Sequence, residues 1–400
     1  QDIYLTGNPQ ITFFKVVYRR HTNFSMECIR QTFKGTPGAG ARVVATLARN
    51  GDLVHDCFIK FGGYKAVGYG ANPGHNVIDN IECEIGGQLI DKHPGHWMEA
   101  HAELTESEGG GVCPANKISF AQSDSGDGLP PAPSSFIMTA MAGGVTAVAA
   151  SAVSPAIPIF VPLRFWFCRH VGLSLPLIAL QYHEVNINVN FSAGDASGTH
   201  RGAATFLNDA GGDVSLWCNY IYLDTDERRR FAQVSHEYLI EQVQVQTFSP
   251  SSGQNTLKLN FNHPVKELVW VGLGHDWGTT SSGEFIKFFS SPTDTAQLKL
   301  NGHDRFEKIE STYFTRYQIY KYHTGIPCTT SIDCVQVYSF ALKPEEHQPS
   351  GTCNFSRIDN AQLIISGVNL STPVRIIYVY AVNYNVLRIM SGMGGLAYSN

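Results

Sequence analysis

Charged residues are scarce in this sequence, and neither sign is in large excess. Asp, Glu, Lys and Arg make up 16% of the 400 residues, and the formal net charge is −5. A protein that wraps nucleic acid needs a strong cationic excess, so we expect no direct binding to nucleic acid. Low charge together with 11% aromatic residues fits a chain that hides much surface, either in a large β core or against other chains.

The short motifs that carry common enzyme chemistry are also missing. The sequence contains no Gly-x-Ser-x-Gly, no Gly-x-x-x-x-Gly-Lys, no His-Glu-x-x-His and no His-x-His. A His-x-His pair is what a jelly-roll metalloenzyme needs, because residues two apart on a strand direct both imidazoles at one metal. We therefore predict a protein that is not an enzyme, with no catalytic, cofactor-binding or metal-binding residues and no cofactor.

One histidine cluster requires a test as a metal site. It consists of His93, His96 and His101, with Cys113 downstream. Zinc needs three or four converging ligands, but His96 and His101 are five residues apart and do not share a helix face. We interpret these residues as structural.

The nine cysteines are odd in number, and most lie in strand-like segments. We expect Cys28, Cys57, Cys83 and Cys218 to be small buried hydrophobic side chains. Cys328 and Cys334 could pair across a loop, but folding in a reducing compartment fits the sequence better.

No secretory signal is visible. The glycosylation sequons are therefore expected to be coincidental; they begin at Asn23, Asn190, Asn354 and Asn369.

Turn and strand signals dominate what is present, with 38 Gly and 19 Pro residues. Asn50-Gly51-Asp52 between two apolar segments predicts a hairpin, because Asn and Gly tolerate positive φ. His93–Glu106 has the composition of a helix. The predicted strands are Phe24–Phe33, Arg42–Arg49, Leu53–Phe61, Ile78–Ile85, Gln88–Asp91, Ile159–Phe167, Leu173–Phe191, Val214–Leu223, Tyr238–Thr247, Thr256–Asn262, Lys266–Gly272, Glu284–Phe289, Gln297–Leu300, Val335–Leu342, Ala361–Val368 and Val374–Val382.

Residues 107–158 have the composition of a loop, with Gly109-Gly110-Gly111, Pro130-Pro131 and several serine runs. Within them, Phe136–Val153 approaches the length of a membrane span. Its small residues, the prolines that follow and the lack of a basic flank argue against one. We predict a long surface insertion.

Two halves of the chain repeat one pattern around a polar joint, Asp224–Gln242. Asp224 or Thr225 can cap a short helix there. Three pairs of segments recur in the same order, and the last pair sets Arg230 opposite Arg388. The pairs are Ile81–Lys92 with Leu298–Phe306, Ala179–Val189 with Asn354–Ile364, and Tyr220–Phe231 with Tyr378–Ile389. Many short strands in two similar halves predict an all-β protein made of sandwiches or jelly rolls.

Several stretches resemble one protein family closely. NPQITFFKVVYRRHTNF at the N-terminus is similar to the signature of the major capsid proteins of nucleocytoplasmic large DNA viruses, especially those infecting algae. The similarity continues in RNGDL (49–53), GGQLIDKH (86–93), RFAQVSHEYLIEQ (230–242), LNGHDRF (300–306), QPSGTCNFSRIDNA (348–361) and NYNVLRIMSGMGGLAY (383–398). The chain departs from the family pattern at the insertion 107–158.

The resemblance implies two tandem eight-stranded antiparallel jelly rolls, a double jelly roll, with short helices in loops and at the joint. The expected organisation is an N-terminal arm 1–23, a first jelly roll 24–224 with the insertion 107–158, a linker 225–236 and a second jelly roll 237–400. The implied function is a structural major capsid protein that forms a homotrimeric, pseudo-hexagonal capsomer of an icosahedral shell.

That function implies neighbouring capsomers and minor capsid proteins beneath the shell as partners. It also implies proximity to an internal membrane without spanning it, assembly in the host cytoplasm and a final location in the virion. Two alternatives remain open: a minor capsid paralogue at a special shell site, and a carbohydrate- or receptor-binding jelly-roll module. For the second, Trp270 and Trp277 with Asp276 are the candidate residues.

Overall fold

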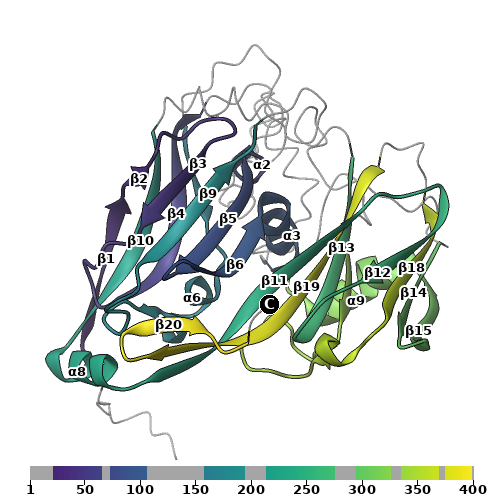
Figure 1. The fold of residues 1–400 in the computed structure, drawn as a ribbon. Coiled ribbons are helices and arrows are strands. Elements are labelled where there is room, and N and C mark those ends of the chain that lie inside the picture. Colours follow the sequence, from purple (N-terminus) through teal and green to yellow (C-terminus); the bar gives the residue numbers. More distant parts are fainter. Residues whose placement is uncertain are drawn as a thin grey trace, which may run out of the picture.

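The computed structural model describes residues 21–64, 73–105, 157–193, 213–274, 294–325, 335–368 and 374–398. They form two β-barrels side by side, the first coloured purple to teal and the second green to yellow (Figure 1). Each barrel consists of two antiparallel sheets. The predicted all-β, double jelly-roll fold is confirmed.

In the first barrel, one sheet has the order β1-β10-β4-β7, with β8 paired to β4, and the facing sheet has the order β2-β3-β9-β5-β6. The chain therefore crosses repeatedly between the sheets, which is the jelly-roll topology. The bounds are β1 Phe24–Gln31, β2 Phe33–Lys34, β3 Arg42–Thr46, β4 Leu53–Tyr64, β5 Ile78–Ile85, β6 Gln88–Pro94, β7 Ile157–Pro162, β8 Leu175–Pro176, β9 Val185–Phe191 and β10 Val214–Leu223.

The second barrel repeats this topology. Its sheets have the orders β11-β19-β13-β16, with β17 and β20 attached, and β12-β18-β14-β15. Thus β11, β19, β13 and β16 take the places of β1, β10, β4 and β7. The bounds are β11 His236–Phe248, β12 Gly253–Leu259, β13 Pro264–Gly274, β14 Thr295–Leu300, β15 His303–Glu310, β16 Val335–Ser339, β17 Cys353–Asn354, β18 Ala361–Val368, β19 Val374–Met390 and β20 Met393–Leu396.

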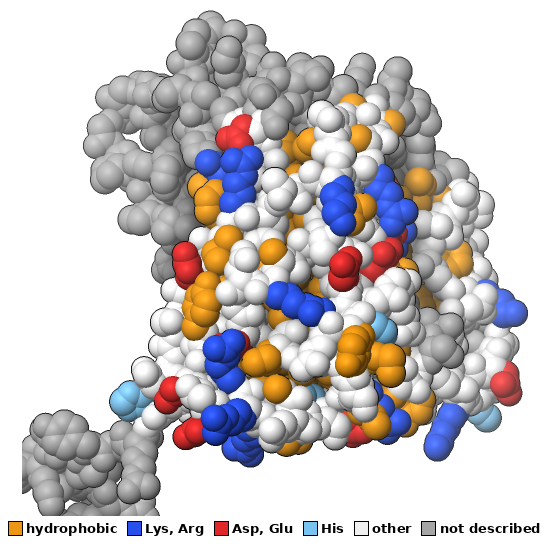
Figure 2. Space-filling view, turned by 60° about the vertical axis from the view of Figure 1, so that its left-hand side comes forward, with side chains coloured by type: hydrophobic (Ala, Val, Ile, Leu, Met, Phe, Trp, Pro, Cys, Tyr) orange, Lys and Arg blue, Asp and Glu red, His pale blue; other side chains and the backbone are white. Residues whose placement is uncertain are grey.

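Alternating side chains close each barrel around its own core. In β12, Leu257 and Leu259 are buried while Lys258 between them is exposed, as the two-residue period of a strand requires. Leu363 of β18 lies between Leu257 and Leu298 of the neighbouring strands and is fully buried. On the surface of the first barrel, hydrophobic side chains lie in small groups among Lys and Arg side chains (Figure 2).

Short helices occupy the connections. The joint forms α8 (Thr225–Gln233), whose first N–H is capped by the Asp224 carboxylate, as predicted. Arg228 of α8 then pairs with the buried Asp52 at 2.9 Å, which attaches the joint to the first barrel. The other short helices are α2 Pro73–Asn76, α3 Gly95–Thr105, α6 Trp166–Arg169, η2 Val171–Leu173, η3 Tyr313–Tyr317, α9 Gln318–Tyr322 and η4 Phe355–Arg357. No helix in the described ranges is long and apolar enough to cross a bilayer.

The three repeated segment pairs fall on equivalent strands, but the predicted correspondence between Arg230 and Arg388 in the third pair is wrong. The first pair covers the β5–β6 and β14–β15 hairpins, the second covers β9 and β18, and the third covers β10 and β19. In the third pair Arg230 lies in α8 whereas Arg388 lies in β19, so these two arginines are not equivalent. β19 continues as a strand where the first half of the chain has already turned into a helix.

Residues 159–191 differ most from their predicted strands. β7 ends at Pro162, and Trp166 and Phe167 belong to α6. Residues 177–184 are irregular, although their alternation predicted a strand. The Arg49 guanidinium explains this, because it donates to the carbonyls of Leu180 and Gln181 at 2.6 and 2.8 Å in place of a neighbouring strand.

Other expectations are also corrected. β15 was not predicted, because its side chains are mostly exposed on both faces and show no alternation. The strand predicted at Val374–Val382 ends too early, because β19 continues to Met390 and β20 follows it. Cys28 is exposed rather than buried, whereas Cys57, Cys83 and Cys218 are buried as predicted. Some predictions fall wholly or mostly outside the described residues: the N-terminal arm, the insertion, the strand at 284–289, and the roles of Cys113, Asp276, Trp277, Cys328, Cys334 and Asn369.

The core of the second barrel should tolerate no cavity at Leu363. We expect Leu363→Ala to lower the free energy of unfolding by about 2–5 kcal/mol, because a fully buried leucine loses its contacts and leaves a void. The neighbouring Gln362→Ala serves as the control, since Gln362 is half-buried, and its effect should stay within about 0.5 kcal/mol. Thermal and denaturant unfolding measure both; equal effects of the two substitutions would contradict this packing.

Candidate functional site: the seam between the barrels

Helix α3 projects from the first barrel onto the second. It begins at Gly95, where a Cβ would lie 2.2 Å from the Ile78 carbonyl oxygen and 2.3 Å from that of His75. Only glycine fits there, so Pro94-Gly95 sets the direction in which the chain leaves β6. Trp97, Ala100 and Leu104 of α3 are almost completely buried.

The residues that cover α3 lie on the outer face of the β11-β19-β13-β16 sheet, except Ile319, which belongs to α9. They form one apolar cluster with the helix, which we call the seam cluster: Trp97, Ala100, Leu104, Val243, Val269, Val271, Ile319, Val335, Val337, Tyr380 and Val382. Burying a large apolar side chain contributes about 1.5–3 kcal/mol, so this cluster is a substantial attachment. As a consequence β13 is buried on both faces, and Leu268, Val269, Trp270 and Val271 are all inaccessible.

A hydrogen bond orients the helix within the seam cluster. The Tyr380 hydroxyl and His96 Nδ1 are 2.6 Å apart, and the Trp97 ring centroid is 5.0 Å from that of Tyr380. Burial raises the pKa of Tyr380 well above its usual value, so the hydroxyl keeps its proton.

Beside the cluster, buried charges from both barrels meet at one carboxylate. Glu241 of β11 pairs with Arg169 of α6 and, at 2.7 Å, with Lys266 of β13. Glu241 is 4% and Lys266 1% exposed. The Lys266 ammonium also donates to the Pro344 carbonyl at 2.6 Å. Charges this deep are stable only while all partners stay together.

Arg169 also reaches α3. Its Nη2 lies 3.3 Å from His101 Nε2. Burial and the neighbouring Arg169 cation lower the pKa of His101 well below its usual range, so the ring is neutral and can accept this hydrogen bond. The charge group therefore connects α6, α3, β11 and β13.

A second charge group lies where the end of α9 meets the end of α3. His323 Nε2 is 3.3 Å from Glu267 and its Nδ1 is 3.2 Å from Glu345. Burial alone would lower the pKa of His323, but the two carboxylates raise it to about 9. The next residues bond to α3, with Thr324 Oγ1 donating to the Thr105 carbonyl at 3.0 Å and Gly325 N to that of Leu104 at 2.8 Å.

The C-terminal strands β19 and β20 attach the second barrel to the first on the side opposite α3. Ile240, Leu387 and Ile389 belong to the core of the first barrel although their strands belong to the second. The Tyr182 N–H donates to the Gly392 carbonyl at 3.0 Å, beside β20. The two barrels are thus held together at α3 and at the β19–β20 hairpin.

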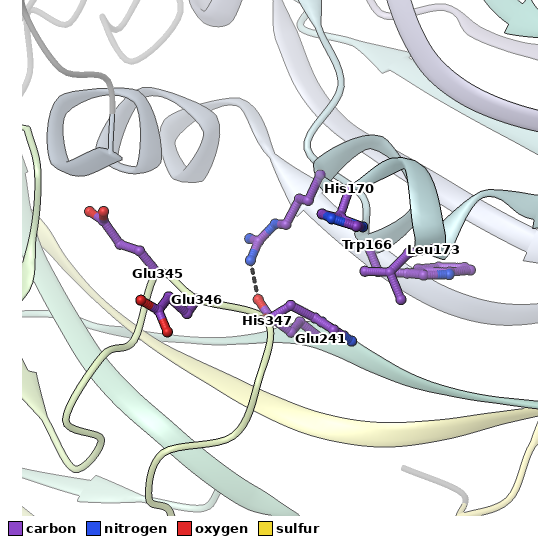
Figure 3. A pocket seen from close by; sticks show the side chains of 8 residues that line it. Trp166, His170, Leu173, Glu241, Glu345, Glu346 and His347 are labelled. Atoms are coloured by element: carbon purple, nitrogen blue, oxygen red, sulfur yellow. Dashed lines mark hydrogen bonds and ion pairs between the residues drawn. The ribbon is translucent and has the colours of Figure 1, made fainter. Parts of the chain in front are cut away.

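A cavity of about 290 Å³ opens beside the charge groups. Glu241 lies at its wall (Figure 3), where it forms the ion pair with Arg169. The lining mixes carboxylates, imidazoles and apolar side chains: Trp166, Arg169, His170, Leu173, Glu241, Glu345, Glu346 and His347. Within the described stretches, no three His, Cys, Asp or Glu side chains converge as a metal site would need.

The residues weighed from the sequence have structural partners. His93 Nε2 lies 2.8 Å from Asp91, His96 bonds Tyr380 and His101 contacts Arg169, so the three histidines face different partners. Trp270, a candidate for carbohydrate contact, is fully buried and lies 5.3 Å from the Phe314 ring. Sequence reasoning missed Glu241, Lys266 and His323. For Glu241 and Lys266 the available signal was a charged residue inside a predicted strand, whereas His323 lies at the end of α9 and had no such signal.

Two jelly rolls of equal topology, joined rigidly in one chain, define the class of double jelly-roll capsid proteins. The chain belongs to the family of large eukaryotic DNA virus major capsid proteins: that family model matches residues 227–395, and the model of the major capsid protein N-terminus matches residues 12–224.

Individual relatives agree with this assignment. The major capsid protein of Pyramimonas orientalis virus is 48% identical over all of this chain and 97% of its own length. That of Paramecium bursaria Chlorella virus 1 is 38% identical over all of this chain and 97% of its own length. The quasi-atomic model of the PBCV-1 virus capsid superposes with a TM-score of 0.75 at 34% identity, covering 97% of this chain and 100% of that chain. The Faustovirus major capsid protein, 12% identical with a TM-score of 0.65 over 97% of this chain and 94% of that one, shares the fold.

Removing the central carboxylate should open the seam. We expect Glu241→Gln to cost about 3–5 kcal/mol of unfolding free energy, because the buried Lys266 ammonium and the half-buried Arg169 guanidinium lose their counter-charge. Adding Lys266→Met should restore part of the loss. The exposed pair Lys343–Glu346 provides the control, since Lys343→Met should change stability by less than about 1 kcal/mol. Chemical denaturation measures all four proteins, and a neutral Glu241→Gln would contradict the charge group.

His323 should make stability depend on pH. Its folded pKa of about 9 exceeds the usual 6.5, so its contribution is complete below pH 6.5 and is lost as the pH rises through 9. The size is on the order of 3 kcal/mol. We expect the melting temperature of the native chain to fall between pH 6.5 and 9.5, and that of His323→Gln to fall less.

His347→Gln is the matched control for this pH profile. Burial lowers the pKa of His347, so its contribution changes only as the pH falls below 6.5. The His347→Gln protein should keep the slope of the native chain above pH 6.5. If His323→Gln also kept that slope, the assignment of the slope to His323 would be wrong.

Proposed function

We propose that this chain is the structural major capsid protein of a large DNA virus, and that three copies form a pseudo-hexagonal capsomer of the icosahedral shell. The observation that carries the proposal is the pair of topologically equal barrels fixed side by side by the seam. Two similar barrels repeated around a threefold axis give a block with six similar corners, which can tile a flat surface.

We infer the contact between copies from the way in which α3 of one barrel covers a sheet of the other barrel. In the first barrel, α3 follows β6 and covers the outer face of the β11-β19-β13-β16 sheet. In the second barrel, η3 and α9 follow β15, the counterpart of β6. If η3 and α9 act as α3 does, they cover the outer face of the β1-β10-β4-β7 sheet in the next copy of the chain.

Both surfaces have the composition such a contact needs. On the sheet, Phe58 stacks on Trp217 with centroids 6.4 Å apart, and Phe160 lies 5.8 Å from Phe58 and is 37% exposed. On the helices, Tyr317 is 49% and Tyr320 87% exposed. Aromatic side chains are enriched at interfaces between proteins, so their exposure on both surfaces supports pairing between copies.

The proposed division of the chain follows from the strand pairing. We place the first jelly roll at 24–224, the linker at 225–236 and the second jelly roll at 237–400, after an arm at 1–23. Each of the four sheets contains strands from one half only, and the family models meet near the same point, at residues 224 and 227.

The proposed partners are other capsomers and minor capsid proteins beneath the shell, with assembly in the host cytoplasm and a final place in the virion. A net charge of −5 does not favour direct contact with nucleic acid. No observation favours the alternatives of a special-site paralogue or a carbohydrate-binding module, and the burial of Trp270 removes one candidate for the latter.

The mass in solution tests the assembly. Light scattering on the purified protein should give three times the chain mass of 43.9 kDa. Tyr320→Glu should shift the particles towards single chains, because a carboxylate would be buried against Phe58 and Trp217.

Tyr398→Glu is the matched control, since Tyr398 is 62% exposed at the chain end and should keep the trimer. Single chains of the native protein at all concentrations would contradict the capsomer. If the Tyr320→Glu protein remained a trimer, the proposed contact through Tyr320 would be wrong, but the trimeric capsomer would still stand.

A further inference from the structure

Two buried thiols face each other in the first barrel. Cys57 of β4 and Cys218 of β10 are direct cross-strand partners, 2% and 0% exposed, and their Sγ atoms are 3.1 Å apart. Cross-strand partners have Cα atoms about 4.5–5.5 Å apart, which is within the range that disulfides accept. A bond would only need to shorten the sulfur separation to about 2.05 Å.

A third thiol lies next to this pair. Cys168 of α6 is half-buried, and its thiol is near enough to Cys57 to affect the pKa of that thiol. Its Sγ lies 3.6 Å from the His55 carbonyl, which also receives the Cys57 thiol at 4.0 Å. Cys168 is therefore the member of the group that an external reagent reaches first.

We propose that Cys57 and Cys218 are a latent disulfide pair, oxidised by a low-molecular-weight disulfide such as oxidised glutathione that enters at Cys168. Cys168 attacks the reagent, forms a mixed disulfide and releases one thiol. Cys57 attacks the Cys168 sulfur and releases the second thiol. Cys218 then attacks Cys57 and returns Cys168 to its thiol form. In sum two protein thiols lose two hydrogens and one reagent disulfide becomes two thiols.

The bond would join the two central strands of the β1-β10-β4-β7 sheet and close a loop of 161 residues. Long closed loops gain the most from a crosslink. Burial raises the pKa of Cys57 well above its usual value, so the reaction is slow near neutral pH and faster at higher pH. Only the timing rests on the proposed function: a chain assembled in a reducing cell would be crosslinked after the particle leaves it.

The test uses the native chain of 400 residues. It is incubated with oxidised glutathione at pH 8.5, its remaining thiols are alkylated in denaturant, and peptides are mapped by mass spectrometry without reduction. We expect a Cys57–Cys218 linked peptide and a melting temperature about 5–10 °C higher. Cys168→Ser should slow the linkage several-fold and leave the product unchanged. Cys353→Ser, which removes a half-buried thiol of the second barrel, should leave rate and product unchanged.

Glutathione adducts on the exposed Cys28 without the linked peptide would overturn the proposal, as would a Cys57–Cys168 bond as the final product. An unchanged rate in Cys168→Ser would overturn the entry step. Because the mapping is done on the wild-type chain, the result stands even if a cysteine variant fails to fold. It is also independent of oligomeric mass, so it can fail while the capsomer proposal holds.

Discussion

The carboxylate of Glu241 is the point on which the arrangement of the two barrels depends. It is 4% exposed and lies between a guanidinium from the first barrel and an ammonium from the second. If the barrels separated slightly, the buried charges of Glu241 and Lys266 would lose their partners, which costs several kcal/mol. The seam is therefore stable in one closed geometry and unfavourable in partly open ones.

A fixed angle between barrels matters for a protein that tiles a surface. A tile with a loose hinge has no definite outline, and small angular errors add up across many neighbours. In this chain the apolar seam cluster supplies attraction without direction, whereas the Tyr380–His96 hydrogen bond and the two charge groups supply direction. The hairpin β19–β20 adds a second attachment away from α3, so rotation about one contact is opposed by the other.

Local patterns in the sequence predicted most strands because many strands, such as β3 and β12, alternate between buried and more exposed side chains. The β5–β6 hairpin and the Asp224 cap follow from residues close together in the chain. The hairpin predicted at Asn50-Gly51 is wrong, because β3 and β4 lie in different sheets and the segment between them connects the two sheets of the first barrel. The failures have non-local causes. The segment 177–184 is held irregular by Arg49 from far along the sequence, and β15 has too little buried surface to leave a pattern. The seam could not be predicted either, because nothing in a sequence without its fold brings Arg169 to Glu241.

The two halves of the chain differ at the positions that form the contact between the barrels. In β4 the side chains from Cys57 to Phe61 alternate between buried and half-buried, whereas Leu268 to Val271 of β13 are all buried because α3 covers the second face. In β11 and β19, polar residues stand at buried positions that a simple barrel would fill with apolar ones. Asn385 donates to Gln242 at 2.9 Å, and Gln244 donates to Asn383 at 3.0 Å. A slip of one residue between these strands would separate the buried amides of Gln242, Asn383 and Asn385 from these partners, so the pairs favour one register. The positions where the second half breaks the ordinary strand pattern are thus the positions that turn two similar barrels into one rigid unit.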